Sequence, residues 1–171
     1  MAKAPDFTTE RLMLRPFTAG DIDAMAAMDG DPEVMRFLEP LEEPAVHRTK
    51  LEGWLDDGTD PPGMALWTVR PRVEHDLYLG WVVLFPMPGW EPDVEIVWRF
   101  TRSAWGRGYA TEAARAVMAH GFGTLGLERI FAVLDPRNLR SRRVCEKLGM
   151  HDAGMRRAYD TDCALYVKEG T

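Results

Sequence analysis

Trp105-Gly106-Arg107-Gly108-Tyr109-Ala110 is the stretch of sequence that decides the fold, because it separates a strand pattern from a helix pattern. Val94 to Phe100 reads as a strand, and apolar residues from Ala110 to Leu125 recur on one face of a long helix. Free N–H groups and the dipole at such a helix N-terminus favour an anion, and glycines permit close approach. The stretch predicts an anion-binding turn, although Gly-x-Gly also occurs in turns that bind nothing.

Two other phosphate-binding motifs do not fit this turn. A P-loop requires Gly-Lys-Ser/Thr after four intervening residues, and the sequence contains none. A dinucleotide-binding fold places its glycines near the start of a parallel sheet, whereas an antiparallel meander precedes the turn here. The anion is therefore expected to be held in another fold.

Charge is distributed unevenly along the chain. Net charge is −6, yet residues 1–98 carry 8 Lys/Arg against 19 Asp/Glu, and residues 99–147 carry 10 against 4. The basic block is consistent with a local anion site, or with no more than a solvated helix face. The acidic first half is compatible with a cationic acceptor. Nucleic acid is not expected as a partner, because the acidic chain would be repelled and the block lacks interleaved exposed aromatics.

The remaining patterns predict one α+β domain over residues 1–171. Expected strands cover Phe7 to Phe17, Leu66 to Val69, Leu77 to Phe85, Val94 to Phe100, Ile130 to Leu134, His151 to Arg157 and Ala164 to Lys168. Expected helices run from Asp21 to about Met28, from Asp31 through Val34, Phe37 and Leu38, from Gly108 to Leu125, and from Asn138 to Leu148. Residues 39–63, with a helical piece around Val46 to Leu55, resist assignment.

Several classes of protein are not expected. The N-terminus lacks the apolar region of a signal peptide, and no apolar run approaches the roughly 20 residues that cross a bilayer. This predicts a soluble, cytoplasmic protein without a membrane partner. Cys145 and Cys163 are interpreted as reduced thiols, and the four histidines lack metal spacing, so no metal is expected.

At this point the residues resemble a known family. Val94 to Phe100, Trp105 to Ala113, Asn138-x-x-Ser141 and Glu146 to Met150 resemble the GNAT acetyltransferase signature. The opening Thr9-Glu10-Arg11-Leu12-x-Leu14-Arg15-Pro16 further resembles the Rim-type branch, named for N-terminal acetyltransferases of ribosomal proteins. One departure is Trp105, which stands where the superfamily motif has Gln or Arg.

The resemblance implies a GNAT fold, a mixed and mostly antiparallel splayed sheet of about seven strands flanked by about four helices. Acetyl-CoA as co-substrate would lie where the strands ending at Phe100 and starting at Ile130 splay apart. The implied cofactor-binding residues are Val97, Trp98, Arg99, Trp105, Gly106, Arg107, Gly108, Tyr109, Ala110, Thr111, Asn138, Ser141 and Cys145. A homodimer is a further family-level expectation.

Amine acylation requires an uncharged nucleophile, so a base must remove a proton from an amine of pKa about 8 to 10.4. Strand alternation places Glu95, Val97 and Arg99 on one face and Ile96, Trp98 and Phe100 on the other. Some GNAT enzymes carry a glutamate base at the position of Glu95. We therefore predict Glu95 as the base, acting directly or through water, with an exposed surface glutamate as the alternative.

The leaving CoA thiolate can take a proton from a donor in the cleft, and the residues after Asn138 are the candidates. Many family members use a tyrosine seven residues after the asparagine, where this chain has Cys145. Asn138, Ser141 and Cys145 lie on one helical stripe that can face the cleft. Ser141 or a water is the predicted donor, with Ser141 as a simple CoA contact as the alternative, and Cys145 is expected to be a core thiol rather than a nucleophile.

The predicted function is transfer of an acetyl group from acetyl-CoA to a primary amine, by direct attack in a ternary complex. The acceptor is a protein N-terminus or a small-molecule amine. The alternatives are a non-catalytic acyl-CoA-binding module and an N-acyltransferase that uses a longer acyl-CoA. The acceptor itself is not indicated by any motif.

Overall fold

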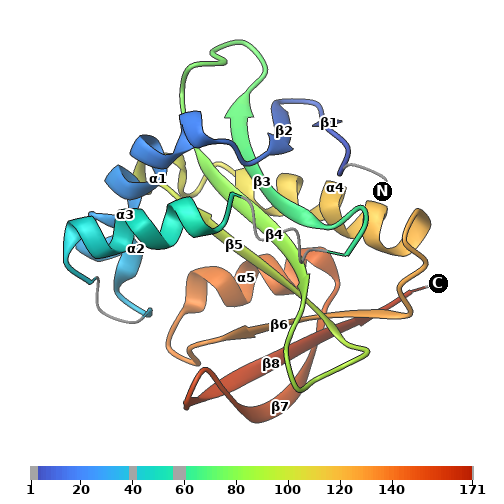
Figure 1. The fold of residues 1–171 in the computed structure, drawn as a ribbon. Coiled ribbons are helices and arrows are strands. Elements are labelled where there is room, and N and C mark those ends of the chain that lie inside the picture. Colours follow the sequence, from blue (N-terminus) through green and yellow to red (C-terminus); the bar gives the residue numbers. More distant parts are fainter. Residues whose placement is uncertain (1–3, 39–41, 56–60, 171) are drawn as a thin grey trace.

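The computed structural model describes residues 4–38, 42–55 and 61–170, and Figure 1 shows an α+β fold built on one sheet. Within the described residues the sheet has eight strands in the order β1-β2-β3-β4-β5-β6-β8-β7. The strands are β1 (Phe7–Thr8), β2 (Leu12–Pro16), β3 (Ala65–Pro71), β4 (Gly80–Pro86), β5 (Val94–Phe100), β6 (Arg129–Leu134), β7 (His151–Ala158) and β8 (Thr161–Glu169). The helices are α1 (Ile22–Asp29), α2 (Pro32–Met35), α3 (Pro44–Gly53), α4 (Tyr109–Gly123) and α5 (Leu139–Leu148). The predicted fold class is confirmed.

The sheet splays at its centre. Strands β3 to β5 form the predicted antiparallel meander, which β2 extends, and β6, β8 and β7 form a second antiparallel unit. The two units meet through parallel pairing of β5 with β6, which covers only Val94 with Ile130 and Glu95 with Phe131. Beyond Glu95 the two strands are no longer paired, so the sheet opens where the family resemblance implied it would.

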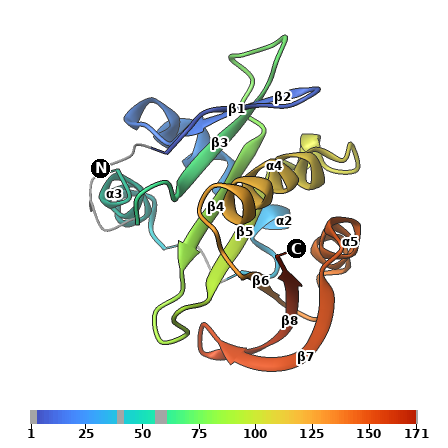
Figure 2. The ribbon, with the colours of Figure 1, turned by 90° about the vertical axis from the view of Figure 1, so that its right-hand side faces the viewer.

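Helices cover both faces of the sheet (Figure 2). Helix α4 packs on β2, β4 and β5, with Ala113, Ala114 and Val117 fully buried in the main core. Its Gly121 lets the sheet approach, because a Cβ there would lie 2.8 Å from the Ile130 side chain. Helix α5 lies beside α4. The opposite face carries a second core in which α1 and α3 pack on Trp81.

The N-terminal strand differs from the prediction. Phe7 to Phe17 was expected to be one strand, but a tight turn divides it into β1 and β2. The Thr9 N–H donates to the Leu12 carbonyl at 2.9 Å, and the Leu12 N–H donates to Thr9 Oγ1 at 3.1 Å. The turn reverses the chain, so that β1 pairs with β2, and it adds an eighth strand.

Helix α2 is shorter than predicted. Asp31 caps it by accepting the Glu33 N–H at 3.0 Å, and Pro32 opens it, as the sequence indicated. The helix ends at Met35, so Phe37 and Leu38 follow it rather than lie on it. Of the unassigned residues 39–63, α3 occupies Pro44–Gly53, while residues 39–41 and 56–60 lie outside the described residues. No helix in the described part of the chain is long and apolar enough to cross a membrane.

Candidate active site

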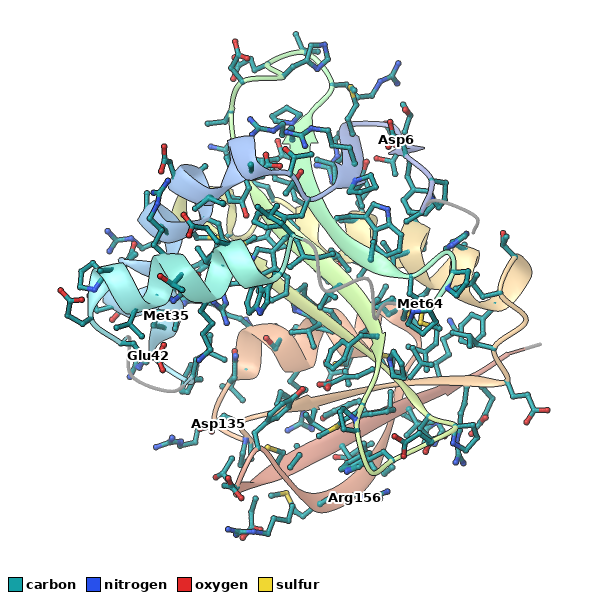
Figure 3. All side chains as sticks on the ribbon, viewed as in Figure 1. Asp6, Met35, Glu42, Met64, Asp135 and Arg156 are labelled. Carbon is teal, nitrogen blue, oxygen red and sulfur yellow. The ribbon has the colours of Figure 1, made fainter. Side chains whose placement is uncertain are left out.

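A cleft of about 420 Å³ opens where β5 and β6 diverge. Its walls come from β5, from the turn before α4, from the end of β6, from α5, and from the α2 segment. Asp135, at the end of β6, lies on the same side of the molecule as Met35 of α2, whereas Arg156 of β7 lies away from this side (Figure 3). Of the predicted site residues, the cleft is lined by Val97, Trp98, Arg99, Trp105, Gly106, Gly108, Tyr109, Ala110, Thr111, Asn138 and Ser141.

The glycine turn adopts a conformation that presents its amides. Gly106 and Gly108 have φ of +75° and +79°, in the left-handed region that favours glycine, and Gly108 is the N-cap of α4. Within the described residues, none of the N–H groups of residues 106–111 donates a backbone hydrogen bond. A Cβ at Gly106 would meet no atom within 4 Å, so the space above the turn is open. These amides are available to an anion.

Unpaired cations gather around this turn. Arg140, Arg143 and Lys147 of α5 line the cleft, and Arg107 lies in the turn itself. Among the described side chains none of the four forms an ion pair, whereas the neighbouring Arg142 pairs with Glu146 at 3.1 Å. The basic block of the sequence therefore places uncompensated positive charge beside the free amides.

The start of α5 also faces the cleft. Asn138 caps the helix, and its Oδ1 accepts the Ser141 N–H at 3.2 Å. Both residues line the cleft together with Val144 and Lys147. Cys145, the third member of the predicted stripe, is not among the residues that line the cleft and is fully buried in the main core, as expected of a core thiol. Cys145 and Leu148 are the buried residues of α5, and both pack in the main core. Burial raises the pKa of the Cys145 thiol to about 12.

Strand β5 has the predicted alternation. Ile96 and Phe100 belong to the core beneath α4, whereas Val97 packs against the core beneath α1 and α3. On this second face Arg99 donates to the Asp29 carboxylate at 2.8 Å. Asp29 is fully buried and also contacts His47 Nε2 at 3.0 Å. The charge of Arg99 is therefore compensated from α1.

Glu95 lies deeper than predicted. It was predicted to be the base, with an exposed surface glutamate as the alternative, but its exposed fraction is 1 %. Its neighbours Ile96 and Val133 line the cleft. Burial raises the pKa of Glu95 to about 7, although hydrogen bonds from Tyr159 and from the Val133 backbone favour the charged form. A carboxyl with this pKa can take up and release protons near neutral pH.

Tyr159 is a site residue that sequence reasoning missed. Its phenol O–H donates to Glu95 Oε2 at 2.5 Å across 64 positions of sequence. The residue lies in the two-residue turn Tyr159-Asp160 between β7 and β8, where no motif singles it out. Glu95 Oε1, by contrast, is buried without a hydrogen-bond partner among the described residues.

No group of three or more His, Cys, Asp and Glu side chains in the described part of the chain is arranged to hold a metal ion. The site therefore consists of free amides, unpaired cations and a buried carboxyl. The first two suit a phosphate-bearing ligand, and the third suits proton transfer.

Comparison with known proteins agrees with this geometry. Residues 11–151 match the family described as the acetyltransferase (GNAT) domain. The chain is 32% identical over 153 residues to the uncharacterized N-acetyltransferase YnaD of Bacillus subtilis, covering 86% of this chain and 83% of that protein. It is 31% identical over 169 residues to FsC-acetyl coenzyme A-N(2)-transacetylase of Aspergillus fumigatus, covering 92% and 70%. The crystal structure of a GNAT-family acetyltransferase from Bacillus anthracis superimposes with a TM-score of 0.81 at 28% identity, covering 96% and 98%.

Proposed function

Because the chain belongs to the GNAT acetyltransferases, which take an acyl group from acyl-CoA, we propose that it acetylates a primary amine from acetyl-CoA by direct attack in a ternary complex. The acceptor is a protein N-terminus or a small-molecule amine. The observation that carries the proposal is the cleft between β5 and β6, which has the turn of free amides along its wall and Glu95 beside it. These features supply the two requirements of the reaction, a phosphate clamp and a base.

The residues of the cleft fit the parts of CoA. The amides of residues 106–111 and the unpaired Arg140, Arg143 and Lys147 suit the phosphates. The backbone of Val97 to Arg99 is unpaired on the side where β6 diverges, so it can hydrogen-bond the amides of pantetheine as a further strand would. Asn138 and Ser141 stand on the opposite wall of the cleft and can contact the same arm.

Glu95 is the base in this proposal. A protonated amine that reaches the cleft is a poor nucleophile, and a carboxylate of pKa about 7 accepts its proton directly or through water. A proton donor helps to expel the CoA thiolate but is not obligatory, because the parent thiol has a pKa of only about 8.5. Ser141 or a water is proposed for that role, since Ser141 lines the cleft. Cys145 is unsuited to it, because the thiol is buried in the core.

Membership of the Rim-type branch is part of the proposal and rests on the opening motif Thr9 to Pro16. Two residues of that motif connect it to the phosphate turn. Thr9 Oγ1 donates to Glu112 of α4 at 2.6 Å, and Arg11 Nη1 donates to the Arg107 carbonyl at 2.9 Å. The motif thus stabilises the start of α4. A homodimer is expected from the resemblance, and light scattering during size-exclusion chromatography would measure it.

The decisive experiment is a thiol-release assay with acetyl-CoA over a panel of amines and N-terminal peptides. Mass spectrometry of the acceptors identifies the modified amine. Glu95→Gln is expected to lower kcat at least a hundredfold while calorimetry shows unchanged binding of CoA. CoA binding without turnover of any acceptor would favour the binding module. Faster turnover with propionyl-CoA or butyryl-CoA than with acetyl-CoA would favour the longer acyl group.

A further inference from the structure

We propose that Tyr159 is a positioning residue for Glu95: it holds carboxylate oxygen Oε2, so that Oε1 is the oxygen that receives the proton of the amine. This inference rests on the proposed function. In the step, an N–H bond of the ammonium breaks and its electron pair stays on nitrogen. An O–H bond then forms at Oε1, and the carboxylate becomes a carboxylic acid.

The two carboxylate oxygens have different surroundings. Oε2 accepts the Tyr159 hydroxyl at 2.5 Å, a short contact of the kind that a charged acceptor forms. Oε1 has no partner within the described residues. A buried polar atom without a partner is costly, because it has lost its hydrogen bonds to water. The lone pairs of Oε1 are therefore free to accept a proton, whereas Oε2 already accepts the Tyr159 hydroxyl.

The backbone at Tyr159 is strained, because the turn that carries it has two non-glycine residues with positive φ. Tyr159 and Asp160 have φ of +50° and +59°, in the left-handed region that bulky residues rarely adopt. Ala158 pairs directly with Thr161, so the two residues form the whole connection between β7 and β8. Such a turn favours Asn-Gly over Tyr-Asp. The strained turn places the phenol over Glu95, while Tyr159 as a whole remains 52 % exposed.

Few groups near Glu95 can influence its ionisation, and Tyr159 is the one that donates a side-chain hydrogen bond to it. The titratable groups that face Glu95 are Tyr159 in the β7–β8 turn and Cys163 of β8. Burial raises the pKa of both, and the Glu95 carboxylate raises it further. Its cross-strand neighbours are Phe85 of β4 and Phe131 of β6, which do not titrate. No cation is paired with Glu95 among the described residues. The phenol and the Val133 backbone both favour the ionised carboxylate, and of the two only the phenol belongs to a side chain.

Tyr159→Phe tests the inference, because it removes the hydroxyl and keeps the ring. We expect the acidic limb of the pH profile of kcat/KM to move up by about one pH unit. At pH 7 the rate would fall about fivefold, since a smaller fraction of Glu95 is ionised. KM for acetyl-CoA is expected to stay unchanged. A fall in rate without movement of the acidic limb would overturn the inference.

A double-mutant cycle with Glu95→Gln separates positioning from a general structural effect. If Tyr159 acts through Glu95, Tyr159→Phe costs nothing further in the Glu95→Gln background. The same fivefold loss in that background would contradict the inference. Asp160→Asn is the matched control, because asparagine tolerates the left-handed region and the residue does not contact Glu95. It is expected to leave the pH profile in place.

A direct measurement keeps this inference separate from the proposed function. Carbon-13 NMR of labelled glutamate carboxyls, with the Glu95 signal assigned by its loss in Glu95→Gln, follows the titration of Glu95 without any substrate. Tyr159→Phe should raise the pKa of Glu95, and 3-fluorotyrosine at position 159, a stronger donor, should lower it. Unchanged titration in both proteins would overturn the positioning role. Absence of turnover with every amine would instead overturn the proposed function.

Discussion

The guanidinium of Arg140 lies 4.1 Å from the centroid of the Trp105 ring. The indole cannot turn freely, because its Nε1–H donates to the Phe100 carbonyl at 2.9 Å. Trp105 therefore offers a fixed aromatic face on which Arg140 stacks at the wall of the cleft. The charge of Arg140 is thereby held beside Trp105, the residue at which this chain departs from the family motif.

Arg140→Gln should weaken the binding of acetyl-CoA, because one charge-assisted contact to phosphate is lost. We expect KM for acetyl-CoA to rise roughly tenfold with kcat unchanged. Steady-state kinetics at several salt concentrations measures this effect, which should shrink as salt screens the charges. Arg142→Gln is the control, since Arg142 is paired with Glu146. An equal rise in KM for both variants would point to net charge rather than to the Trp105 stack.

Gly108→Ala should disturb the phosphate turn. Alanine is strained at φ +79°, and its Cβ would lie 3.4 Å from Arg11 Nη2. We expect a loss of about 1 kcal/mol in the free energy of unfolding and a higher KM for acetyl-CoA. Gly123→Ala is a control at the other end of α4, where the added Cβ meets no atom within 4 Å. Urea denaturation measures the free energy of unfolding of both variants, and steady-state kinetics measures KM. A loss of stability in Gly123→Ala as well would show that α4 tolerates alanine poorly at either end, and that the effect is not specific to the turn.

The buried carboxyl of Glu95 predicts a pH dependence of stability. Its pKa is about 7 in the folded protein against 4.5 as the ordinary value, so the folded state binds more protons between these pH values. The free energy of unfolding should fall by about 3 kcal/mol over this range because of Glu95 alone. The decline ends about one pH unit above the folded pKa, where the group is ionised in both states. In Glu95→Gln this part of the decline should be absent, and superimposable stability curves for the two proteins would refute the shifted pKa.

Asp29→Ala should destabilise the second core. Asp29 is fully buried and pairs with Arg99, which is mostly buried itself. Removal of the carboxylate leaves the Arg99 guanidinium without its partner and should cost about 3 kcal/mol. Thermal unfolding measures the loss. Asp23→Ala, which removes an exposed pair with Arg48, should leave Tm nearly unchanged. Similar losses in the two variants would mean that burial of the pair contributes little.

Much of the cleft could be predicted because its parts are local in sequence. The strand Val94 to Phe100, the glycine turn and the helix after it follow one another along the chain, and each has its own pattern of spacing. The cap Asn138 likewise has its partner Ser141 three residues away. Burial of Cys145 could not be predicted in the same way, since a stripe on a helix does not show which neighbour covers it.

The contact of Tyr159 with Glu95 lies beyond such reasoning. The two residues meet because β8 returns beside β6, which places the β7–β8 turn over β5. Pairing of distant strands depends on the whole fold and has no local signal. The burial of Glu95 could not be predicted for the same reason. Alternation along the strand indicates which face of β5 carries Glu95, but not which residues cover that face.

The contacts of Arg11 and Thr9 with α4 have a practical consequence. The Arg11 N–H and Nε donate to the Glu112 carboxylate at 2.9 and 2.7 Å, so the β1–β2 turn is fastened to the first turn of α4. Expression variants that begin after Arg11 would lose this fastening, and their affinity for CoA would drop although the cleft itself was left intact. Variants made for kinetic work should therefore keep the residues before Leu12.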